Sequence, residues 1–323
     1  MIPYVLRRLL NLVPVLWAVV TLIWICVFLL PGDPARLLAG GQRFDPRVVA
    51  RIRAEWRLDD PAPVQYLRYL SGLARGDLGT SYLQERPVSR VIGEAFPPTA
   101  VLAVAAILIA SVGGIGLGLL SAAYSRRWVD ELLALFTLVC VSLPAFWLGL
   151  MLILLFASGL GWLPVLGYGM EGARIPGTGI RLPELRHLVL PALTLSLISL
   201  GTIARITRAS LLEVLDRDYI RSSAAQGTGP TALYLRHALR NALIPVITVI
   251  GIDFAALLGG AVATEFVFAW PGLGKAIVRG IADRDLPVVE GGVICLSLAF
   301  VLVNLAVDLC YVLIDPRVRL GKP

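Results

Sequence analysis

Few residues of this 323-residue chain combine a type and a spacing that could support chemistry. Residues 272–276, GLGKA, look like the end of a phosphate-binding loop, in which glycine backbone and a lysine hold nucleotide phosphates. That loop also needs a glycine five residues before its second glycine and a Ser or Thr after its lysine. Alanine occupies both places, as Ala269 and Ala276. The sequence therefore predicts that this chain has no nucleotide site of its own.

Hydrolytic chemistry has no better support. A serine protease within a membrane needs a nucleophilic Ser with a His base in reach. The sequence holds two histidines, His187 and His237, which flank different apolar stretches, and neither belongs to an HExxH zinc motif. The four cysteines show no CxxC pair and no Cys/His ligand spacing. We expect a chain that is not an enzyme and that binds no metal or other cofactor itself.

Asp253 is an acidic residue inside an apolar stretch, ten residues from its start. If that stretch spans a membrane, the carboxylate lies near the midplane, where a charge is costly and normally faces a cavity or a partner. Two interpretations follow. Asp253 lines a translocation path, or it belongs to a structural pair, for instance with Arg205, and the sequence leaves both open.

Apolar stretches dominate the chain and must position these residues. Hydrophobic residues make up 57% and charged residues 16% of the sequence, and the mean hydropathy is +0.80. A bilayer core about 30 Å thick needs roughly 20 apolar helical residues to cross it. The sequence therefore predicts an all-α integral membrane protein with six transmembrane helices. The six stretches are 9–30, 99–124, 132–157, 188–207, 243–264 and 288–314.

The basic residues predict an orientation. With the N-terminus in the cytoplasm, twelve Lys or Arg fall in the inner segments and six in the two short outer loops. The positive-inside rule then places both termini in the cytoplasm. The first stretch is longer than the apolar run of a signal peptide and is expected to stay as an uncleaved helix. Because the net charge of +7 is spread through loops, we expect membrane lipid and no nucleic acid as a partner.

The longest loop, 31–98, is expected to form a small extracytoplasmic region. It has helical spacing over 46–57 and 62–75, followed by a Gly-rich turn at 75–81. Pro97 and Pro98 are expected to begin the second span, since proline is tolerated in a first helical turn.

Glycines recur within the second apolar stretch, as GGIGLG at 113–118. A dinucleotide-binding fingerprint would need a strand before these glycines, whereas here they lie inside a continuous apolar helix. Gly114 and Gly118 have the spacing that lets two helices approach closely. We expect packing rather than nucleotide binding.

Two further connections stand out. Segment 208–242 is rich in Arg, Ser and Ala and contains QGTGP at 226–230, which suits a surface helix that inserts into a groove on another protein. Composition alone fits an ordinary solvated loop better. The connection 265–287 carries EFVFAWPGLGK, in which Phe268 and Trp270 fit an interfacial aromatic position and the Pro-Gly pair requires an abrupt turn.

The order of these motifs resembles the permease subunits of binding-protein-dependent ABC importers, in the dipeptide/oligopeptide/nickel branch. The resemblance covers nearly the whole chain. The motifs are RRLL…P (7–14), PGDPA (31–35), LDDPAPVQYLRYLSGLARGDLGTSY (58–82), SLPAFWLGL (142–150), HLVLPALTL (187–195), RHALRNALIPV (236–246), LLGGAVATEFVFAWPGLG (257–274) and DLPVV…VLVNLAVDLCYVLIDPRVR (285–319).

This resemblance implies a type I ABC importer transmembrane fold in a prokaryotic plasma (inner) membrane. Its parts are expected to be a first helix (1–30), an extracytoplasmic loop region (31–98), a transport core (99–314) and a cytoplasmic tail (315–323). The implied partners are a second homologous permease subunit in a heterodimer, two ABC ATPase subunits that bind ATP-Mg, and an extracytoplasmic substrate-binding protein.

The family's coupling motif, Glu-Ala-Ala followed after three residues by Gly, falls within the segment 215–235. The residues that the resemblance assigns to ATPase coupling are Arg221, Ser222, Ser223, Ala224, Ala225, Gln226 and Gly227. The first three replace Glu-Ala-Ala, and Gln226 stands where the branch commonly has Lys. These departures put individual contacts in doubt but not the location.

The cargo implied by family frequency is a di- or oligopeptide, with nickel or glutathione as alternatives in the same importer class. The residues expected to face the binding protein are Glu265, Trp270, Pro271 and Gly272. A self-sufficient secondary transporter or channel is the alternative of another class, and it predicts inverted internal repeats, of which the sequence shows no convincing example.

Overall fold

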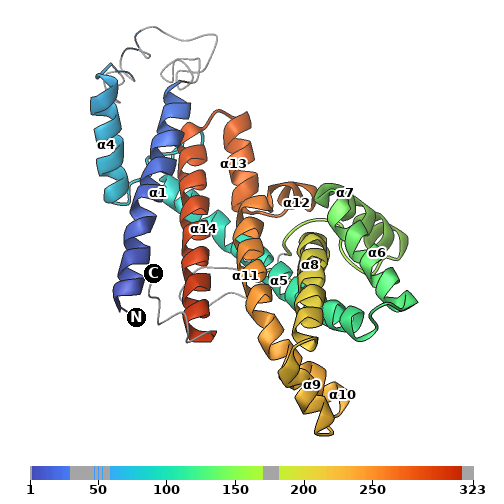
Figure 1. The fold of residues 1–323 in the computed structure, drawn as a ribbon. Coiled ribbons are helices and arrows are strands. Elements are labelled where there is room, and N and C mark those ends of the chain that lie inside the picture. Colours follow the sequence, from blue (N-terminus) through green and yellow to red (C-terminus); the bar gives the residue numbers. More distant parts are fainter. Residues whose placement is uncertain are drawn as a thin grey trace.

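The computed structural model describes residues 2–29, 47, 50, 53, 59–169 and 182–314. Most of the predicted helix 46–57 and all of the tail 315–323 lie outside the described residues. The regular secondary structure of the described part is helical, apart from one isolated β-bridge between Thr80 and Pro87 (Figure 1). Its elements are α1 (Ile2–Phe28), α4 (Ala62–Ala74), α5 (Val88–Ala123), α6 (Trp128–Ser142), α7 (Ala145–Leu152), η1 (Ile153–Gly159), α8 (Leu185–Leu215), α9 (Asp218–Ala225), α10 (Pro230–Ala232), η2 (Leu233–Ala238), α11 (Leu239–Gly260), α12 (Val262–Val267), α13 (Leu273–Ala282) and α14 (Leu286–Ile314).

Within the described residues, four helices are long and apolar enough to cross a membrane: Val88–Ala123, Leu185–Leu215, Pro230–Gly260 and Leu286–Val307. A fifth span exists if α6 and the bent segment after it count as one. The apolar part of α1, Leu12–Phe28, is shorter than these. The all-α membrane class is therefore confirmed, whereas the count of six spans is not reproduced in full.

The stretch 132–157, predicted to be one continuous span, is bent. Its two helical parts, Trp128–Ser142 and Ala145–Gly159, make an angle of 108°. The break lies at Leu143 and Pro144, both of which are extended, with ψ of 136°. Proline has no N–H for the helix and disfavours helical geometry at the residue before it, so the chain turns here.

The expected start of the second span was also wrong. The helix α5 begins at Val88, and Pro97 and Pro98 lie inside it. The helical turns of α5 that precede the two prolines are stable because their side chains are buried. Val88, Val91 and Ile92 pack in one core cluster with α13 and α14. Tertiary packing thus keeps the helix continuous where the sequence suggested a start.

The contact between α5 and α8 forms the centre of the bundle, and α5 runs obliquely across the other spans (Figure 1). Glycines make the contact close. A Cβ on Gly114 would lie 2.8 Å from Ile203, and one on Gly118 would lie 2.5 Å from Thr207 Cβ and 2.6 Å from the Ala204 carbonyl oxygen. The predicted packing role of these two glycines is confirmed, because no larger residue fits there.

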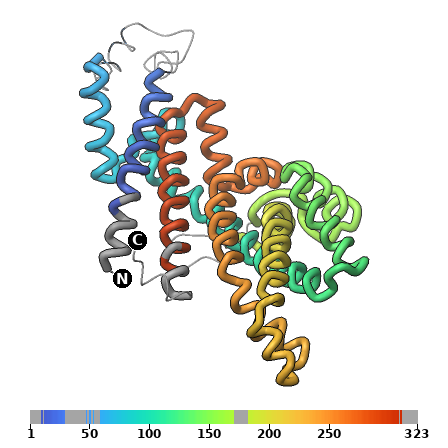
Figure 2. Tube along the Cα trace, in the orientation of Figure 1, coloured from blue at the N-terminus to red at the C-terminus, as the bar shows by residue number. Residues whose placement is uncertain are grey.

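The two ends of the bundle differ. The short helices α9 and α10 project beyond α8 and α11 at one end, whereas α4 and α13 lie toward the other (Figure 2). Helix α4 matches the predicted helix 62–75 and lies against α1, where Tyr66 and Thr21 hydroxyls are 2.6 Å apart.

Gly118→Ala is expected to destabilise the folded protein by about 1–3 kcal/mol, because the new methyl group meets α8 backbone that cannot move aside. Gly116→Ala is the matched control, since its Cβ would meet nothing within 4 Å in the same helix. The thermal midpoint of the purified protein in detergent should fall for the first variant only. Equal midpoints would show that α5 and α8 are not in the contact described.

Candidate functional site

The short helix α9 is anchored to the bundle by one buried residue. Ile220 is 2% exposed and packs with Ala122 of α5, Leu211 of α8, Ala238 of η2 and Ala242 of α11. Three long helices and the π-helical turn therefore meet at a single side chain of α9. Because close-packed interiors transmit strain, a displacement of α9 must move these helices with it.

A glycine turn ends α9. Gly227 has φ of +86°, and its N–H donates to the Ala224 carbonyl at 3.0 Å, which is the geometry of a helix C-cap. Thr228 N–H donates to the Ser223 carbonyl at 3.3 Å. Pro230 then begins the next short helix, where its missing N–H costs nothing. The sequence thus fixes both the end of α9 and the restart of the chain.

The outer surface of this turn makes no contact with the other described parts of the chain. Of the seven residues expected to couple, Ser223 is half-buried and the other six are exposed. The Arg221 side chain is 67% exposed and lies 3.8 Å from Asp216. The structure therefore gathers the predicted coupling residues on one projecting helix and the turn after it, which we call the coupling tip (residues 218–230).

A broad groove lies beside the coupling tip, between the end of α8 and the start of α11. It has a volume of about 1020 Å³ and is lined by Ser210, Glu213, Val214, Arg217, Tyr219, Arg236, His237, Arg240, Asn241, Ala242, Ile244 and Pro245. Asn241 Nδ2 donates to the Tyr219 hydroxyl at 2.6 Å and so ties α9 to α11. Arg217 forms an exposed ion pair with Glu213 at 2.6 Å. The groove therefore adjoins the coupling tip and carries arginines on its walls.

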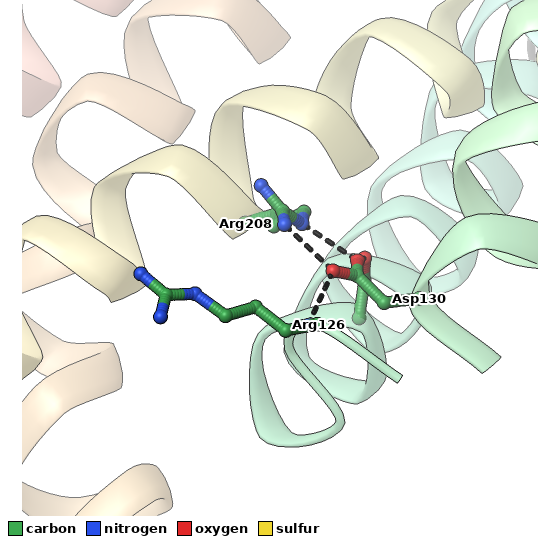
Figure 3. A network of polar contacts seen from close by, with 4 residues as sticks. Arg126, Asp130 and Arg208 are labelled. Atoms are coloured by element: carbon green, nitrogen blue, oxygen red, sulfur yellow. Dashed lines mark hydrogen bonds and ion pairs between the residues drawn. The ribbon is translucent and has the colours of Figure 1, made fainter. Parts of the chain in front are cut away.

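A buried carboxylate braces the same end of the bundle (Figure 3). Asp130, 6% exposed in the first turn of α6, accepts from Arg208 Nε and Nη2 at 2.7 Å each. It also accepts from the Ser121 hydroxyl and from the Arg126 backbone N–H, the latter at 3.1 Å. We call these four residues the Asp130 clamp, which joins α5, the α5–α6 turn, α6 and α8.

Sequence reasoning did not identify the Asp130 clamp. Asp130 and Arg208 are 78 residues apart in the chain, and neither belongs to a local motif. The stretch predicted from hydropathy began at residue 132, so Asp130 fell in the connection before it and gave no signal of a partner. The clamp lies directly beside the Ile220 anchor, because Ser121 precedes Ala122 in α5 and Arg208 precedes Leu211 by one turn of α8.

Asp253 lies on α11 with an incomplete set of partners. Its Oδ2 atom is buried and has no hydrogen-bond partner within the described part of the chain. The side chain that it faces is Ser199 of α8, and no ion pair joins it to Arg205 among the described residues. The pair with Arg205 that the sequence suggested is therefore not formed among the described residues.

At the other end of the bundle, Glu265 organises the turn between α12 and α13. Glu265 is 0% exposed and accepts from the Thr99 hydroxyl at 2.6 Å and from the Lys275 backbone N–H at 2.9 Å. Thr99 in turn accepts from Leu273 N–H at 2.8 Å. Burial raises the pKa of the Glu265 carboxyl, against the lowering effect of these hydrogen bonds. The carboxyl therefore holds the turn against α5.

Glycine and tryptophan complete this turn. A Cβ on Gly272 would lie 2.1 Å from Glu265 Oε1, so only glycine leaves room for the carboxyl. Trp270 is 0% exposed, and its Nε1 donates to the Pro98 carbonyl at 3.0 Å. Its ring meets Tyr168 edge to face at 4.7 Å. The Glu265 carboxyl, the Pro98 carbonyl and the Tyr168 ring therefore each hold part of the turn in place.

These contacts correct two expectations. Glu265, Trp270 and Gly272 were expected to face a binding protein, but all three are buried in this chain, and only Pro271 of the four is exposed. Phe268 and Trp270 are not interfacial aromatics, since they are 2% and 0% exposed. The apolar residues between Glu265 and Gly272 therefore belong to a buried turn and not to an exposed surface.

A second outer link joins the loop after α4 to the α13–α14 turn. Asp285 is 3% exposed and accepts from the Ser81 hydroxyl and from the Tyr82 backbone N–H, the latter at 3.0 Å. The sequence placed Ser81 in a Gly-rich turn but gave no partner for it. This contact positions part of the predicted extracytoplasmic region on the transport core.

Comparison with known sequences identifies the kind of protein to which the chain is similar. Residues 114–320 match the family described as "Binding-protein-dependent transport system inner membrane component", and residues 1–103 match "Binding-prot-dependent transport system membrane comp, N-term". The chain is 41% identical over 319 residues to the glutathione transport system permease protein GsiC of Salmonella paratyphi A, covering 99% of both chains. The GsiC protein of Escherichia coli K12 is 40% identical over the same length and coverage.

Solved structures support the fold alone. The inward-facing MetNI methionine ABC transporter matches with a TM-score of 0.57 at 18% identity, over 70% of this chain and 96% of that chain. An amino acid ABC transporter matches with a TM-score of 0.52 at 13% identity, over 69% of this chain and 94% of that chain. The arrangement of the helices is therefore that of ABC transporter transmembrane subunits.

Asp130→Asn is expected to destabilise the folded protein by about 1–3 kcal/mol, because it removes the negative charge from a pair in which the side chain of Asp130 is 8% and that of Arg208 35% exposed. Glu213→Gln removes one partner of the exposed Arg217 pair and is the control, with a cost below about 1 kcal/mol. Thermal midpoints in detergent compare the two. Similar midpoints would mean that the Asp130 clamp does not brace this end of the bundle.

Proposed function

The chain belongs to the family of binding-protein-dependent transport system inner membrane components, and we propose that it forms one half of the translocation pathway of an ATP-driven importer. It is a multi-pass ABC importer permease of the peptide/nickel-type branch. The other half of the pathway would be a second homologous permease subunit. Both termini would lie in the cytoplasm, at the end that carries the coupling tip.

The coupling tip carries the proposal. It is exposed on its outer side and anchored on its inner side by Ile220 to α5, α8 and α11. A site that receives mechanical work needs both properties, since the partner must reach it and the displacement must pass on to the bundle. The partner would be one of two cytoplasmic ABC ATPases that bind ATP-Mg. Closure of the ATPases would then tilt the attached helices and switch access of the pathway between the two sides.

The opposite end would receive cargo from an extracytoplasmic binding protein. Pro271 remains as a contact candidate, because it is exposed at the tip of a turn that Glu265 and Trp270 hold rigid. In this proposal the two buried residues position the turn rather than touch the binding protein. The link between Asp285 and Ser81 would keep the extracytoplasmic region aligned with it.

The cargo proposed is a small peptide, with glutathione as the first candidate to test. The GsiC relatives carry glutathione in their printed description and match almost end to end. Glutathione is itself a short peptide, so this choice refines the peptide expectation. Asp253, with an unpartnered carboxylate oxygen in a span, is the proposed path residue and could meet an ammonium group of such cargo.

Reconstitution tests the function directly. The chain would be placed in liposomes alone, and then with its second permease, ATPases and binding protein. Uptake of labelled cargo should require all components and ATP. Uptake by this chain alone, without ATP, would contradict the proposal and favour a secondary transporter or channel. Thermal shifts of the cognate binding protein with glutathione, dipeptides and Ni²⁺ would identify the cargo.

Gly227→Val is expected to reduce the amount of ATPase that co-purifies with the chain at least tenfold, while membrane insertion stays intact. A β-branched residue is strained at φ of +86°, so the turn after α9 must change shape. Gly229→Val is the control. Both positions would leave a Cβ in open space, but Gly229 has φ of −62° and ψ of 152°, which suit valine. Normal co-purification with Gly227→Val would refute the role of the coupling tip.

Asp253→Leu is expected to lower cargo uptake at least tenfold at normal assembly and normal basal ATPase rate, because the pathway loses its carboxylate. Asp253→Asn keeps the shape and the hydrogen-bonding oxygen, and its uptake should fall between those of Leu and Asp. Uptake assays in proteoliposomes give the comparison. Normal uptake by the assembled Leu variant would leave Asp253 a structural residue only.

A further inference from the structure

Arg205 of α8 is a charged residue that neither the coupling tip nor the proposed pathway uses. It is exposed, and no ion pair or hydrogen bond satisfies it among the described residues. It falls in the last turn of the apolar stretch 188–207, where an arginine must extend to the headgroup region or find an anion. The carboxylate that the sequence suggested for it, Asp253, does not pair with it.

A pocket of about 290 Å³ lies beside Arg205, between α5, α6 and α8. Its walls are mainly apolar, and its polar groups include Arg205 and Arg208. The lining residues are Leu117, Ser121, Leu133, Ala134, Thr137, Ala204, Arg205 and Arg208. A pocket with apolar walls and guanidinium groups fits a ligand that has an anionic head and an apolar body.

The charge around the pocket is not balanced within the described chain. Asp130 is fully engaged by Arg208, as Figure 3 shows, and the Arg126 side chain points away from that carboxylate. Neither Arg126 nor Arg127 forms an ion pair among the described residues, and Arg127 lies over the Tyr124 ring at 5.9 Å. With Arg205, three arginines at this corner lack a carboxylate partner in the part of the chain that the structure describes.

Two aromatic residues place this corner at the membrane interface. Tyr124 and Trp128 flank the α5–α6 turn and are 43% and 71% exposed. Tyrosine and tryptophan favour the headgroup level of a bilayer. The turn that holds Arg126 and Arg127 therefore lies among lipid headgroups, and the Asp130 clamp fixes Arg208 at the same level. Arg205 lies one turn of α8 farther into the membrane.

We infer that this corner is a binding site for an anionic phospholipid. The phosphate would meet Arg205, with Arg126 and Arg127 at the rim, and an acyl chain would occupy the wall formed by Leu117 and Leu133. Basic pockets between transmembrane helices bind such headgroups in this way. The lipid would fill the corner next to the Ile220 anchor and so support the end of the bundle that the ATPases move.

The test uses the assembled transporter in detergent and phosphatidylglycerol as the probe, with phosphatidylcholine as the neutral reference. Native mass spectrometry counts the lipid molecules retained after a limited wash. Wild type should retain phosphatidylglycerol in preference to phosphatidylcholine, and Arg205→Gln should reduce that retention about fivefold. Arg205→Lys keeps the charge and should retain most of it.

Arg279→Gln is the matched control, since Arg279 is an exposed arginine on α13 toward the opposite end of the bundle and should leave retention unchanged. No preference for phosphatidylglycerol in wild type, or equal retention by Arg205→Gln, would overturn the inference. A third outcome would also overturn the inference. If the Arg205→Gln complex loses the second permease but retains lipid unchanged, Arg205 belongs to a subunit contact. These readouts need neither cargo nor ATP, but the inference rests on the proposed function for the partner subunits. Failure of the complex to assemble would count against the proposed function, whereas equal lipid retention by an assembled complex would count against the lipid site alone.

Discussion

The close contact between α5 and α8 is the interaction on which the other features depend. Gly114 and Gly118 allow the two backbones to approach so closely that a Cβ at either position would collide with α8. Association of helices in a membrane gains little from the hydrophobic effect, so packing of this kind has to supply the stability. Every feature assigned to function is attached to one of these two helices or to both.

Two groups of polar contacts attach α5 to other parts of the bundle. About ten residues after its start, Pro98 and Thr99 contact the buried turn that contains Glu265 and Trp270. Near its end, Ser121 joins the Asp130 clamp and Ala122 packs on Ile220. Roughly 33 Å of continuous helix separates the two groups of contacts, from Thr99 to Ser121 at about 1.5 Å per residue. A rigid helix fixed at both ends can relate a movement at the coupling tip to a change at the outer turn, provided that the bundle has two discrete arrangements.

The sequence predicted what depends on local pattern. Apolar length gave the membrane class, the spacing of Gly114 and Gly118 gave the helix contact, and the glycines after α9 gave the position of a turn. It missed what depends on distant partners. Asp130 and Arg208 are far apart in the chain, and the burial of Trp270 depends on a carbonyl in α5. Pro144 was visible in the sequence, but hydropathy averaged over the stretch concealed the bend that it causes.

The buried Glu265 and the half-buried Asp253 show how a single subunit can reveal where its partners act. Glu265 receives donors from α5 and from the start of α13, so its cost of burial is compensated inside the chain, and its role is to hold shape. Asp253 has a buried oxygen with no donor, and Arg205 lacks an anion. Burial of an uncompensated polar group is expensive, so a stable assembly must supply the missing partner from elsewhere. Polar groups that lack a partner among the described residues should therefore mark the surfaces that other molecules contact. Polar groups whose partners lie within the chain stabilise its internal structure.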